Sequence, residues 1–434
     1  MNRKYLVFVL SIFYGHALFS QNKSIGFWKG TMDRDDSRME VSFEFKIQKG
    51  VLTGYYNSPA QKASGIPLDS IVVYHDTIFF QLMSEPVTFF KCKANSDSIS
   101  GSFIQKGFAD GIVTLKKSQP PVRNFAVADT SFKSGDSRIA CRIYIPYGTV
   151  KCPGVIFMHG SGAEGMFANQ FFAEHLASKG IITLIQDKRG VGRSTGKWQT
   201  SSFETLASDH INAIQFLKTF KRVNPKQIGI YGHSQGGTIA PLVASRSGDI
   251  AFVIAAEGVG DTVYKQDLYR TANNLKSNGF SPEDVMEAIN YYKLWLDIAR
   301  KGTGYDKIDS LSQAAKNRKW SDWVEIPPKD HWIWKYYLNI GNFNSLEYWK
   351  MISVPVLLVY GEDDQIEDIR NYIQNIDRVL IDHAHNGDVT QVILPKAQHN
   401  LCVSPGKNEP FFWWYISPGY PDLIASWILY RFKN

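Results

Sequence analysis

Apolar and polar residues alternate along the first quarter of the chain, and this alternation indicates β-strands. Met39, Val41, Phe43, Phe45 and Ile47 are separated by single polar or charged residues. A period of two places the apolar set on one face of a half-buried antiparallel strand. Shorter apolar runs follow, separated by turn-forming residues, at 52–56, 71–74, 78–82, 87–91, 99–104 and 112–115. Short strands at this spacing predict a small all-β domain, a barrel or a sandwich, over residues 24–117.

The pattern changes near residue 125, where strands begin to alternate with helices. Short, mostly apolar runs lie at 155–158, 181–185, 228–231, 250–255, 356–360 and 392–394. Segments with apolar residues at helical spacing lie between several of them, as over residues 203–217. Buried strands separated by helices are typical of a mostly parallel sheet with helices on both faces. We therefore predict an α/β domain over residues 125–434, joined to the β domain by the Ser-Gln-Pro-Pro linker at 118–121.

One connection in the predicted α/β domain is too long for an ordinary loop. About a hundred residues separate the strand that ends near Ala256 from the one that begins near Pro355. Apolar residues at helical spacing predict a helical cap at about 260–350. The insertion is rich in tryptophan, at Trp295, Trp320, Trp323, Trp332, Trp334 and Trp349. These residues could form a lid over a site or the core of the insertion itself, and for most of them we favour the core.

The N-terminal segment has the organisation of a secretory signal peptide. Arg3 and Lys4 precede an apolar run over residues 5–14, and small residues lie near Ser20. We predict a signal peptide over residues 1–20, cleaved near Gln21, and an exported protein, periplasmic or secreted, with no stable membrane span afterwards. The alternative is an uncleaved anchor, but the apolar run is short for a membrane span.

Composition, charge and cysteine content narrow the class of protein. The chain has 434 residues, of which 44% are hydrophobic and 21% are charged, which is typical of a globular protein. The net charge of +7 falls to +5 if Arg3 and Lys4 are removed, and no basic stripe points to nucleic acid. The four cysteines show no metal-ligand spacing, so structural or free thiols are the default interpretation.

A glycine-rich turn supplies the strongest chemical signal. Residues 232–236 read Gly-His-Ser-Gln-Gly, between an apolar strand and the start of a helix. A Gly-x-Ser-x-Gly turn in this context lifts the serine hydroxyl above the sheet, at a helix N-terminus. Ser234 is therefore the candidate nucleophile. The alternative is an ordinary glycine-rich turn with a buried serine.

A serine hydroxyl needs a base, and the base needs an orienting carboxylate. Asp364 lies just after the predicted strand 356–360 and is the candidate acid, with Asp363 and Glu362 as weaker choices. His399 follows the last predicted strand and is the candidate base. The three residues then occur in the order serine, acid, histidine.

Two backbone N–H groups would complete such a site as an oxyanion hole. The first is that of Gln235, directly after the candidate nucleophile. The second should come from the loop at residues 159–162, His-Gly-Ser-Gly, where Ser161 is the best candidate and Gly162 the next.

Together these motifs, and the Asp-Lys-Arg-Gly-Val-Gly-Arg-Ser loop at 187–194, resemble the α/β-hydrolase superfamily over residues 125–434. The resemblance implies a Ser-Asp-His hydrolase with no metal or organic cofactor. Within the superfamily the chain looks like the exported esterase branch and is also similar to serine aminopeptidase-like hydrolases. The β-rich front segment lies outside the shared fold and loosely resembles a lipocalin-like barrel.

The leading functional expectation is a serine esterase that acts on a small-molecule or carbohydrate-linked acyl ester. The alternative is a serine peptidase of aminopeptidase or acylaminoacyl type, in which Glu257 could hold the substrate amine. A third possibility is a binding protein with an inactive hydrolase domain, in which Trp28 and Phe27 of the β domain stack on carbohydrate. We expect both aromatic residues to be core instead. The oligomeric state does not follow from the sequence.

Overall fold

The computed structural model describes residues 23–403 and 414–432, which form two compact units. The first contains residues up to 122 together with 414–416, and the second contains residues 123–403 and 417–432. The predicted signal peptide, residues 1–20, lies outside the described residues. Within the described part of the chain, no helix has both the length and the apolar character needed to cross a membrane.

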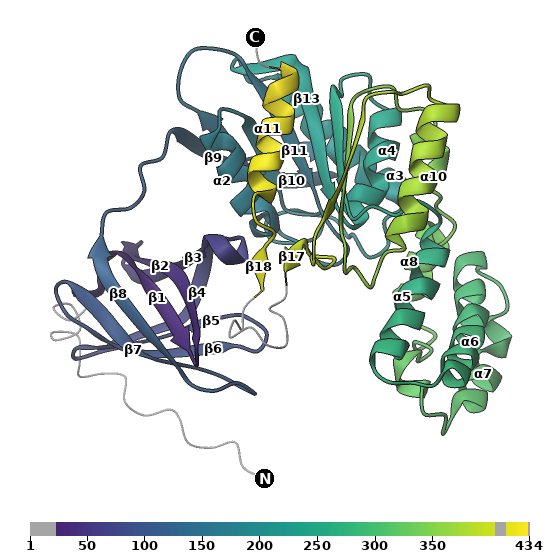
Figure 1. The fold of residues 1–434 in the computed structure, drawn as a ribbon, viewed down its shortest axis with the longest axis horizontal. Helices are drawn as coiled ribbons and strands as arrows, with labels where there is room; N and C mark the ends of the chain where they lie inside the picture. The colour runs from purple at the N-terminus through teal and green to yellow at the C-terminus, as the bar shows by residue number, and fades with distance from the viewer. Residues whose placement is uncertain (1–22, 404–413, 433–434) are drawn as a thin grey trace. The chain divides into compact units, whose positions relative to one another are not determined.

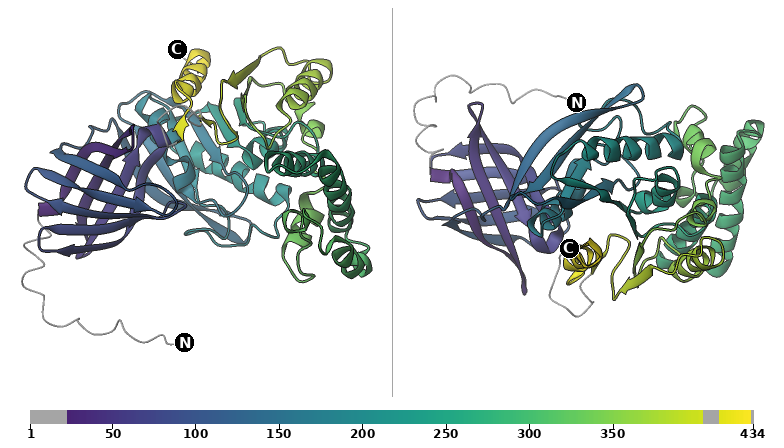
Figure 2. Two further views of the ribbon diagram at one scale, coloured as in Figure 1. Left: turned by 60° about the horizontal axis from the view of Figure 1, so that its bottom comes forward. Right: turned by 90° about the horizontal axis from the view of Figure 1, so that it is seen from above.

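The first unit is a closed barrel of eight strands (Figure 2). All neighbouring strands are antiparallel, and β1 closes the barrel because it pairs with both β2 and β8. The all-β prediction is therefore confirmed, with the barrel rather than the sandwich as its form. The elements are β1 (Gly26–Arg34), β2 (Ser37–Gln48), β3 (Val51–Ser58), η1 (Pro59–Gln61), β4 (Ala63–Tyr74), β5 (Thr77–Leu82), β6 (Thr88–Ala94), β7 (Ser98–Gln105) and β8 (Gly111–Ser118).

Aromatic side chains fill the barrel interior. The inward residues of β2 are buried as the alternation predicted, except that Ile47 at the strand end is 45% exposed. The ring of Phe43 packs against those of Phe80 and Phe90, with centroids 5.4 and 5.6 Å apart. Trp28 is fully buried, and its indole N–H donates to the Ser24 carbonyl at 2.8 Å. Trp28 is thus a core residue, as we expected, whereas Phe27 is only partly buried and does not belong to the core.

The second unit is built on an eight-stranded sheet in the order β16-β15-β14-β13-β11-β12-β10-β9 (Figure 1). Strands β11 to β16 run parallel, and β10 and β9 extend one edge in antiparallel fashion. The parallel strands are β11 (Cys152–Met158), β12 (Ile182–Gln186), β13 (Val223–His233), β14 (Phe252–Ala256), β15 (Val356–Gly361) and β16 (Val389–Leu394). This arrangement confirms the predicted α/β fold.

The two antiparallel edge strands, β9 (Phe125–Ser134) and β10 (Ser137–Pro146), were not predicted. Most of β9 is exposed, so it lacks the continuous buried run that the parallel strands have. Ten backbone pairings with β10 hold it in the sheet instead.

Helices cover both faces of this sheet. One face carries α2 (Gln170–Ser178), preceded by η2 (Met166–Asn169), together with α11 (Tyr420–Phe432). The other face carries α3 (Phe203–Lys218), α4 (Gln235–Ser245), α9 (Leu346–Trp349) and α10 (Ile369–Asp382). Successive side chains of β13 point to opposite faces of the sheet. Ile230 packs with α3 and α4 on one face, and the Tyr231 hydroxyl bonds Tyr420 of α11 on the other. The short strands β17 (Cys402–Val403) and β18 (Tyr415–Ile416) flank the undescribed residues 404–413.

The long insertion is helical, as predicted, and forms a cap beyond the sheet (Figure 1). It consists of α5 (Val263–Ser277), α6 (Pro282–Lys301), η3 (Tyr305–Lys307), α7 (Ile308–Ala315), η4 (Ser321–Trp323) and α8 (Ile333–Ile340). The longest helix, α6, has Ser281 as its N-cap, proline as its first residue and a left-handed Gly302 as its C-cap, which are strong start and stop signals.

The cap has its own core, which contains Trp295, Trp320 and Trp334. Trp349 belongs to the core under the sheet instead, and Trp323 and Trp332 are 42% and 38% exposed. The prediction that the tryptophans form the core of the insertion itself therefore holds for three of the six. All four cysteines are free, which matches the default interpretation of the sequence.

Candidate active site

Ser234 lies at a sharply strained turn between β13 and α4. Its backbone has φ of 55° and ψ of −117°, an unusual conformation for a residue with a side chain. The turn is held in place because the Ser234 N–H donates to the Ala256 carbonyl at 2.8 Å and the Ser234 carbonyl accepts from Thr238 N–H at 2.9 Å. The hydroxyl therefore stands at the N-terminus of α4.

The surrounding glycines are needed because the turn is crowded. A Cβ on Gly232 would lie 2.3 Å from the backbone of Gly236, and one on Gly236 would lie 2.9 Å from the carbonyl oxygens of Met158 and His159. Both positions exclude any larger residue unless the backbone moves. The Gly-x-Ser-x-Gly spacing thus follows from the steric requirements of the turn.

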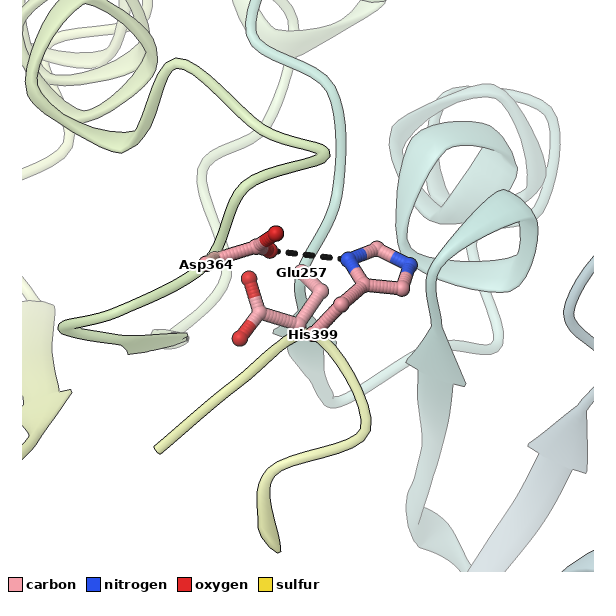
Figure 3. Close-up of side chains that lie close together, drawn as sticks. All are labelled: Glu257, Asp364 and His399. Atoms are coloured by element: carbon pink, nitrogen blue, oxygen red, sulfur yellow. Dashed lines mark hydrogen bonds and ion pairs between the residues drawn. The ribbon is translucent and has the colours of Figure 1, made fainter. Parts of the chain in front are cut away.

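His399 connects Ser234 to Asp364. The Ser234 hydroxyl donates to Nε2 of His399 at 2.9 Å, and Nδ1–H of His399 donates to Oδ2 of Asp364 at 2.8 Å. Figure 3 shows one imidazole nitrogen directed at the Asp364 carboxylate. The His233 ring bonds the His399 carbonyl at 2.8 Å and so fixes the loop that carries the imidazole. The structure brings together the three residues singled out in the sequence.

The Asp364 carboxylate is held in its charged form although it is buried. Burial would raise its pKa, but the hydrogen bond and charge of His399 outweigh burial, and the pKa lies below its ordinary value. Its other oxygen, Oδ1, accepts the N–H groups of Ile366 at 2.6 Å and Glu367 at 3.2 Å. The other two acidic candidates, Glu362 and Asp363, are exposed and do not reach His399.

Two further carboxyl groups are buried beside Asp364. Glu257 is fully buried, and its Oε1 accepts the Gly361 N–H at 2.6 Å. Burial, followed by the charge of Asp364, raises the pKa of Glu257 well above its ordinary value. Burial, followed by the charge of Asp364, also raises the pKa of Glu367 well above its ordinary value. In both groups burial therefore favours the neutral form, whereas the bonds to His399 favour the charged form of Asp364.

The donor set of Glu257, Asp364 and His399 is the one group of the described residues close enough to share a metal ion (Figure 3). Their ligand atoms lie within 4.8 Å of one another. However, both ring nitrogens of His399 already bond Asp364 and Ser234, and burial disfavours the charged form of Glu257. This arrangement fits proton transfer at Ser234 better than metal coordination.

A pocket of about 350 Å³ opens in front of Ser234. Gln235 and Ser161, the two predicted oxyanion-hole residues, both line it. The cap contributes Gln266, Asp267 and Arg270 from α5 and Tyr336 and Tyr337 from α8. The cap is thus both a self-contained core and part of the wall of the site. The full lining is Gly160, Ser161, Glu164, Phe203, His233, Ser234, Gln235, Thr238, Val263, Gln266, Asp267, Arg270, Tyr336, Tyr337, Ile366 and His399.

Sequence reasoning missed most of the polar groups around the pocket. Asp267 is buried and bonds Arg270, one helical turn along α5, and Glu164 accepts the Gly160 N–H at 2.7 Å. Nothing in the sequence connects α5 with the strand ends, because the cap is an insertion of its own. Lys188, in the loop after β12, was recognised as part of a motif but given no role.

Glu257 was considered as the group that holds a substrate amine, and the structure does not support this. Its side chain is fully buried behind Asp364 and does not line the pocket. A carboxyl group just after a strand end can point either toward the cleft or into the protein, and sequence position does not distinguish the two.

Known proteins share these features of sequence and fold. A family model described as serine aminopeptidase, S33, matches residues 152–405, which is more than half of the chain. Esterase EstD of Thermotoga maritima is 24% identical over 307 residues, which cover 66% of this chain and 65% of the esterase. Quorum-quenching protein AidA of Acinetobacter baumannii is 26% identical over 165 residues, 38% of this chain and 54% of that protein. The chain thus spans less than two thirds of the length of either relative.

Further similarity is seen in a third relative and in solved structures. The bifunctional esterase/perhydrolase DCH of Acinetobacter calcoaceticus is 25% identical over 232 residues, 51% of this chain and 78% of that enzyme. The structure of Est1E from Butyrivibrio proteoclasticus with bound ferulic acid has a TM-score of 0.44 at 17% identity, over 70% of this chain and 97% of Est1E. From the family match together with the fold, the chain belongs to the S33 serine aminopeptidase family of α/β-hydrolases.

Proposed function

We propose that the protein is a serine hydrolase that cleaves carboxylic esters through an acyl-enzyme. Ser234 attacks the acyl carbon while His399 takes the hydroxyl proton at Nε2, and Asp364 keeps the imidazole in the required tautomer and stabilises its positive charge. The N–H groups of Gln235 and Ser161 stabilise the oxyanion of the tetrahedral intermediate. His399 then returns the proton to the leaving alcohol.

The second half of the reaction uses the same groups. His399 deprotonates a water molecule, which attacks the acyl-enzyme, and the oxyanion again forms at Gln235 and Ser161. Collapse of the intermediate breaks the bond to Ser234, which regains its proton from His399. The proposed steps need only side chains and backbone groups of this chain.

The observation that carries the proposal is the unbroken hydrogen-bond series from Ser234 through His399 to the ionised Asp364. The strained turn at Ser234 and the helix N-terminus beneath it are further support, because both are needed for an exposed nucleophile next to N–H donors. The names of two relatives, esterase EstD and the esterase/perhydrolase DCH, favour ester substrates. An inactive binding protein would have no need for the three side chains to be bonded in series.

The second candidate is the serine peptidase of aminopeptidase or acylaminoacyl type, which the name of the matching family favours. An aminopeptidase needs an available carboxylate for the substrate amine. Glu257 is buried, Asp267 is paired with Arg270, and Glu164 accepts a backbone N–H. With these carboxylates occupied, ester hydrolysis is the better-supported reaction. The pocket volume of about 350 Å³ fits a small-molecule acyl ester, including one linked to a sugar.

The test combines a nucleophile variant with a substrate panel. Ser234→Ala should keep the fold and lose ester hydrolysis, and a fluorophosphonate probe should label the wild type at Ser234 but not the variant. The panel should contain short-chain esters, acetylated sugars and aminoacyl amides. Faster turnover of aminoacyl amides than of esters would reverse the order of the two candidates. A folded Ser234→Ala protein with wild-type esterase activity would exclude both.

We also propose that the protein is exported, from the basic and apolar character of residues 1–20. N-terminal sequencing of the protein from its native host should begin near Gln21. An intact Met1 on the mature protein would contradict the proposal.

A further inference from the structure

A lysine side chain is buried directly behind the loop that lines the pocket. Lys188 follows β12 and is 4% exposed. Its ammonium group donates to the Gly160 carbonyl at 2.7 Å, the Gly162 carbonyl at 3.1 Å and Oε1 of Gln235 at 2.9 Å. All three of its N–H bonds are therefore directed at neutral oxygens of the two segments that carry the proposed oxyanion-hole donors.

The bond to Gly160 determines where the Ser161 N–H points. In a planar trans peptide the carbonyl of one residue and the N–H of the next point in opposite directions. Because the Gly160 carbonyl is directed at Lys188, the Ser161 N–H is directed away from it. Ser161 lines the substrate pocket, whereas Lys188 lines a separate, water-sized cavity of about 10 Å³. The carbonyls of Gly160 and Gly162 in this loop are thus both directed at Lys188.

The bond to Gln235 acts on the second donor. Gln235 is the first residue of α4 and lines both the pocket and the small cavity. Its side-chain amide accepts from Lys188 and donates to the Tyr336 hydroxyl of the cap at 2.9 Å. Lys188 thus ties together the loop after β11, the start of α4 and, through Gln235, helix α8.

Among the residues that the structure describes, no carboxylate forms a hydrogen bond or ion pair with the Lys188 ammonium group. Glu164 attracts it from a distance, and the nearby histidines His159 and His210 are kept neutral by burial, with their pKa values far below normal. The other charged neighbours, Arg189 and Asp209, pair with each other through two bonds of 2.8 and 2.7 Å. The ammonium also lies 5.2 Å from the ring centroid of Trp198.

We propose that Lys188 is a positioning residue of the oxyanion hole, which orients the Ser161 and Gln235 N–H groups and adds a buried positive charge behind them. This proposal rests on the proposed serine hydrolase function. The charge matters because the intermediate is an anion and the intervening medium is protein rather than water.

The proposal makes the reaction depend on the protonation of Lys188. Burial lowers the pKa of Lys188 to about 8. The charged form exists below this pH, so turnover of a neutral ester should fall as pH rises through about 8.

The experiment compares Lys188→Met and Lys188→Arg with a control, Lys197→Met, an exposed lysine in the same loop. Active sites are counted by fluorophosphonate titration, and kcat for a neutral short-chain ester is given per active site across pH 6–10 (a range chosen to bracket the pKa of about 8). We expect Lys188→Met to lose about tenfold or more in kcat, less than the 10²–10³-fold typical of removing a donor. Its KM should change little, and its kcat should no longer fall as pH rises through about 8.

Lys188→Arg keeps the charge at all these pH values, so it should recover part of kcat, and its kcat should also not fall as pH rises through about 8. The proposal would be overturned if folded Lys188→Met had the wild-type kcat per site, or if its kcat still fell near pH 8. If Lys188→Met does not fold, the proposal is tested by the pH dependence of kcat in the wild type and in Lys188→Arg. A wild-type kcat that does not fall as pH rises through about 8 would overturn the proposal. If Ser234→Ala were active, the proposed function itself would fail, which is a separate result.

Discussion

The barrel and the α/β unit bury side chains of different kinds. The core of the barrel consists of apolar and aromatic residues, and Arg34, which stacks over Phe103 and Phe108, is the one buried charged residue in its described part. The α/β unit has a comparable apolar core but also buries charged and titratable side chains: Asp187, Lys188, Arg189, Asp209, His159, His210, Glu257, Asp267, Asp364 and Glu367.

These buried polar groups gather at the carboxyl ends of the parallel strands. Lys188 follows β12, Glu257 follows β14, and Asp364 follows β15. Burying a charge costs free energy unless it is paired or hydrogen-bonded, and perturbed titratable groups cluster at functional sites. The groups suited to acid–base chemistry are thus concentrated in the α/β unit, whereas the described core of the barrel is mainly apolar.

The largest expected effect comes from the proposed base. His399→Ala should lower kcat by roughly 10⁶-fold, and adding Ser234→Ala should change it little further, because nucleophile and base act as a unit. Steady-state kinetics of the two single variants and the double variant measure this. Multiplicative losses would show that the two residues act independently.

The next effect concerns the choice of carboxylate. Asp364→Asn should lower kcat by about 10⁴-fold, because an amide can bond His399 in the wrong tautomer. Asp363→Asn is the matched control, since its side chain is exposed and one residue away, and it should stay near the wild-type rate. The opposite ranking would show that the acid was wrongly assigned.

A change in the barrel core should affect stability and leave the chemistry unchanged. Phe43→Ala removes a fully buried ring and should cost about 3–5 kcal/mol of barrel stability, measured by chemical denaturation. The kcat per titrated active site should match the wild type. Phe89→Ala, on a side chain that is 50% exposed, is the control and should cost much less. Loss of kcat per site in Phe43→Ala would break the contrast between the units.

The smallest effect is expected at Glu257, the buried carboxyl beside Asp364. The pKa of Glu257 is raised in the folded protein, so the stability it contributes is present below its unfolded pKa and is lost as pH rises toward the folded value. Glu257→Gln should remove that loss and raise the free energy of unfolding at pH 7, with kcat changed by less than about tenfold because the amide keeps the uncharged form that burial favours. Denaturation at several pH values tests this. A lower stability than wild type at pH 7 would contradict a raised pKa of Glu257 in the folded protein.

Much of the fold and of the site was predictable because the signals are local. Period-2 alternation marked the barrel strands, and short apolar runs marked the parallel strands. The elbow at Ser234 is recognisable because steric crowding allows only glycine at its flanks. In contrast, β9 was missed because an exposed antiparallel edge strand is specified by backbone pairing with its neighbour and not by an apolar pattern. The neighbouring β10 is largely buried and carries several apolar residues, so its signal was present in the sequence but was not used.

The sequence alone determined the two kinds of domain, the helical cap, and the order of nucleophile, acid and base. Each depends on the spacing of residues within one short segment or on the end of one strand. Only the tertiary structure decided which form, charged or neutral, is favoured for the groups around Ser234, and that Glu257 points into the protein. It alone also showed that Lys188 donates to the Gly160 carbonyl and to the Gln235 side chain, in the two segments that carry the proposed oxyanion donors. The physical reason is that burial, pairing and pKa depend on neighbours brought from distant parts of the chain, which no local pattern encodes.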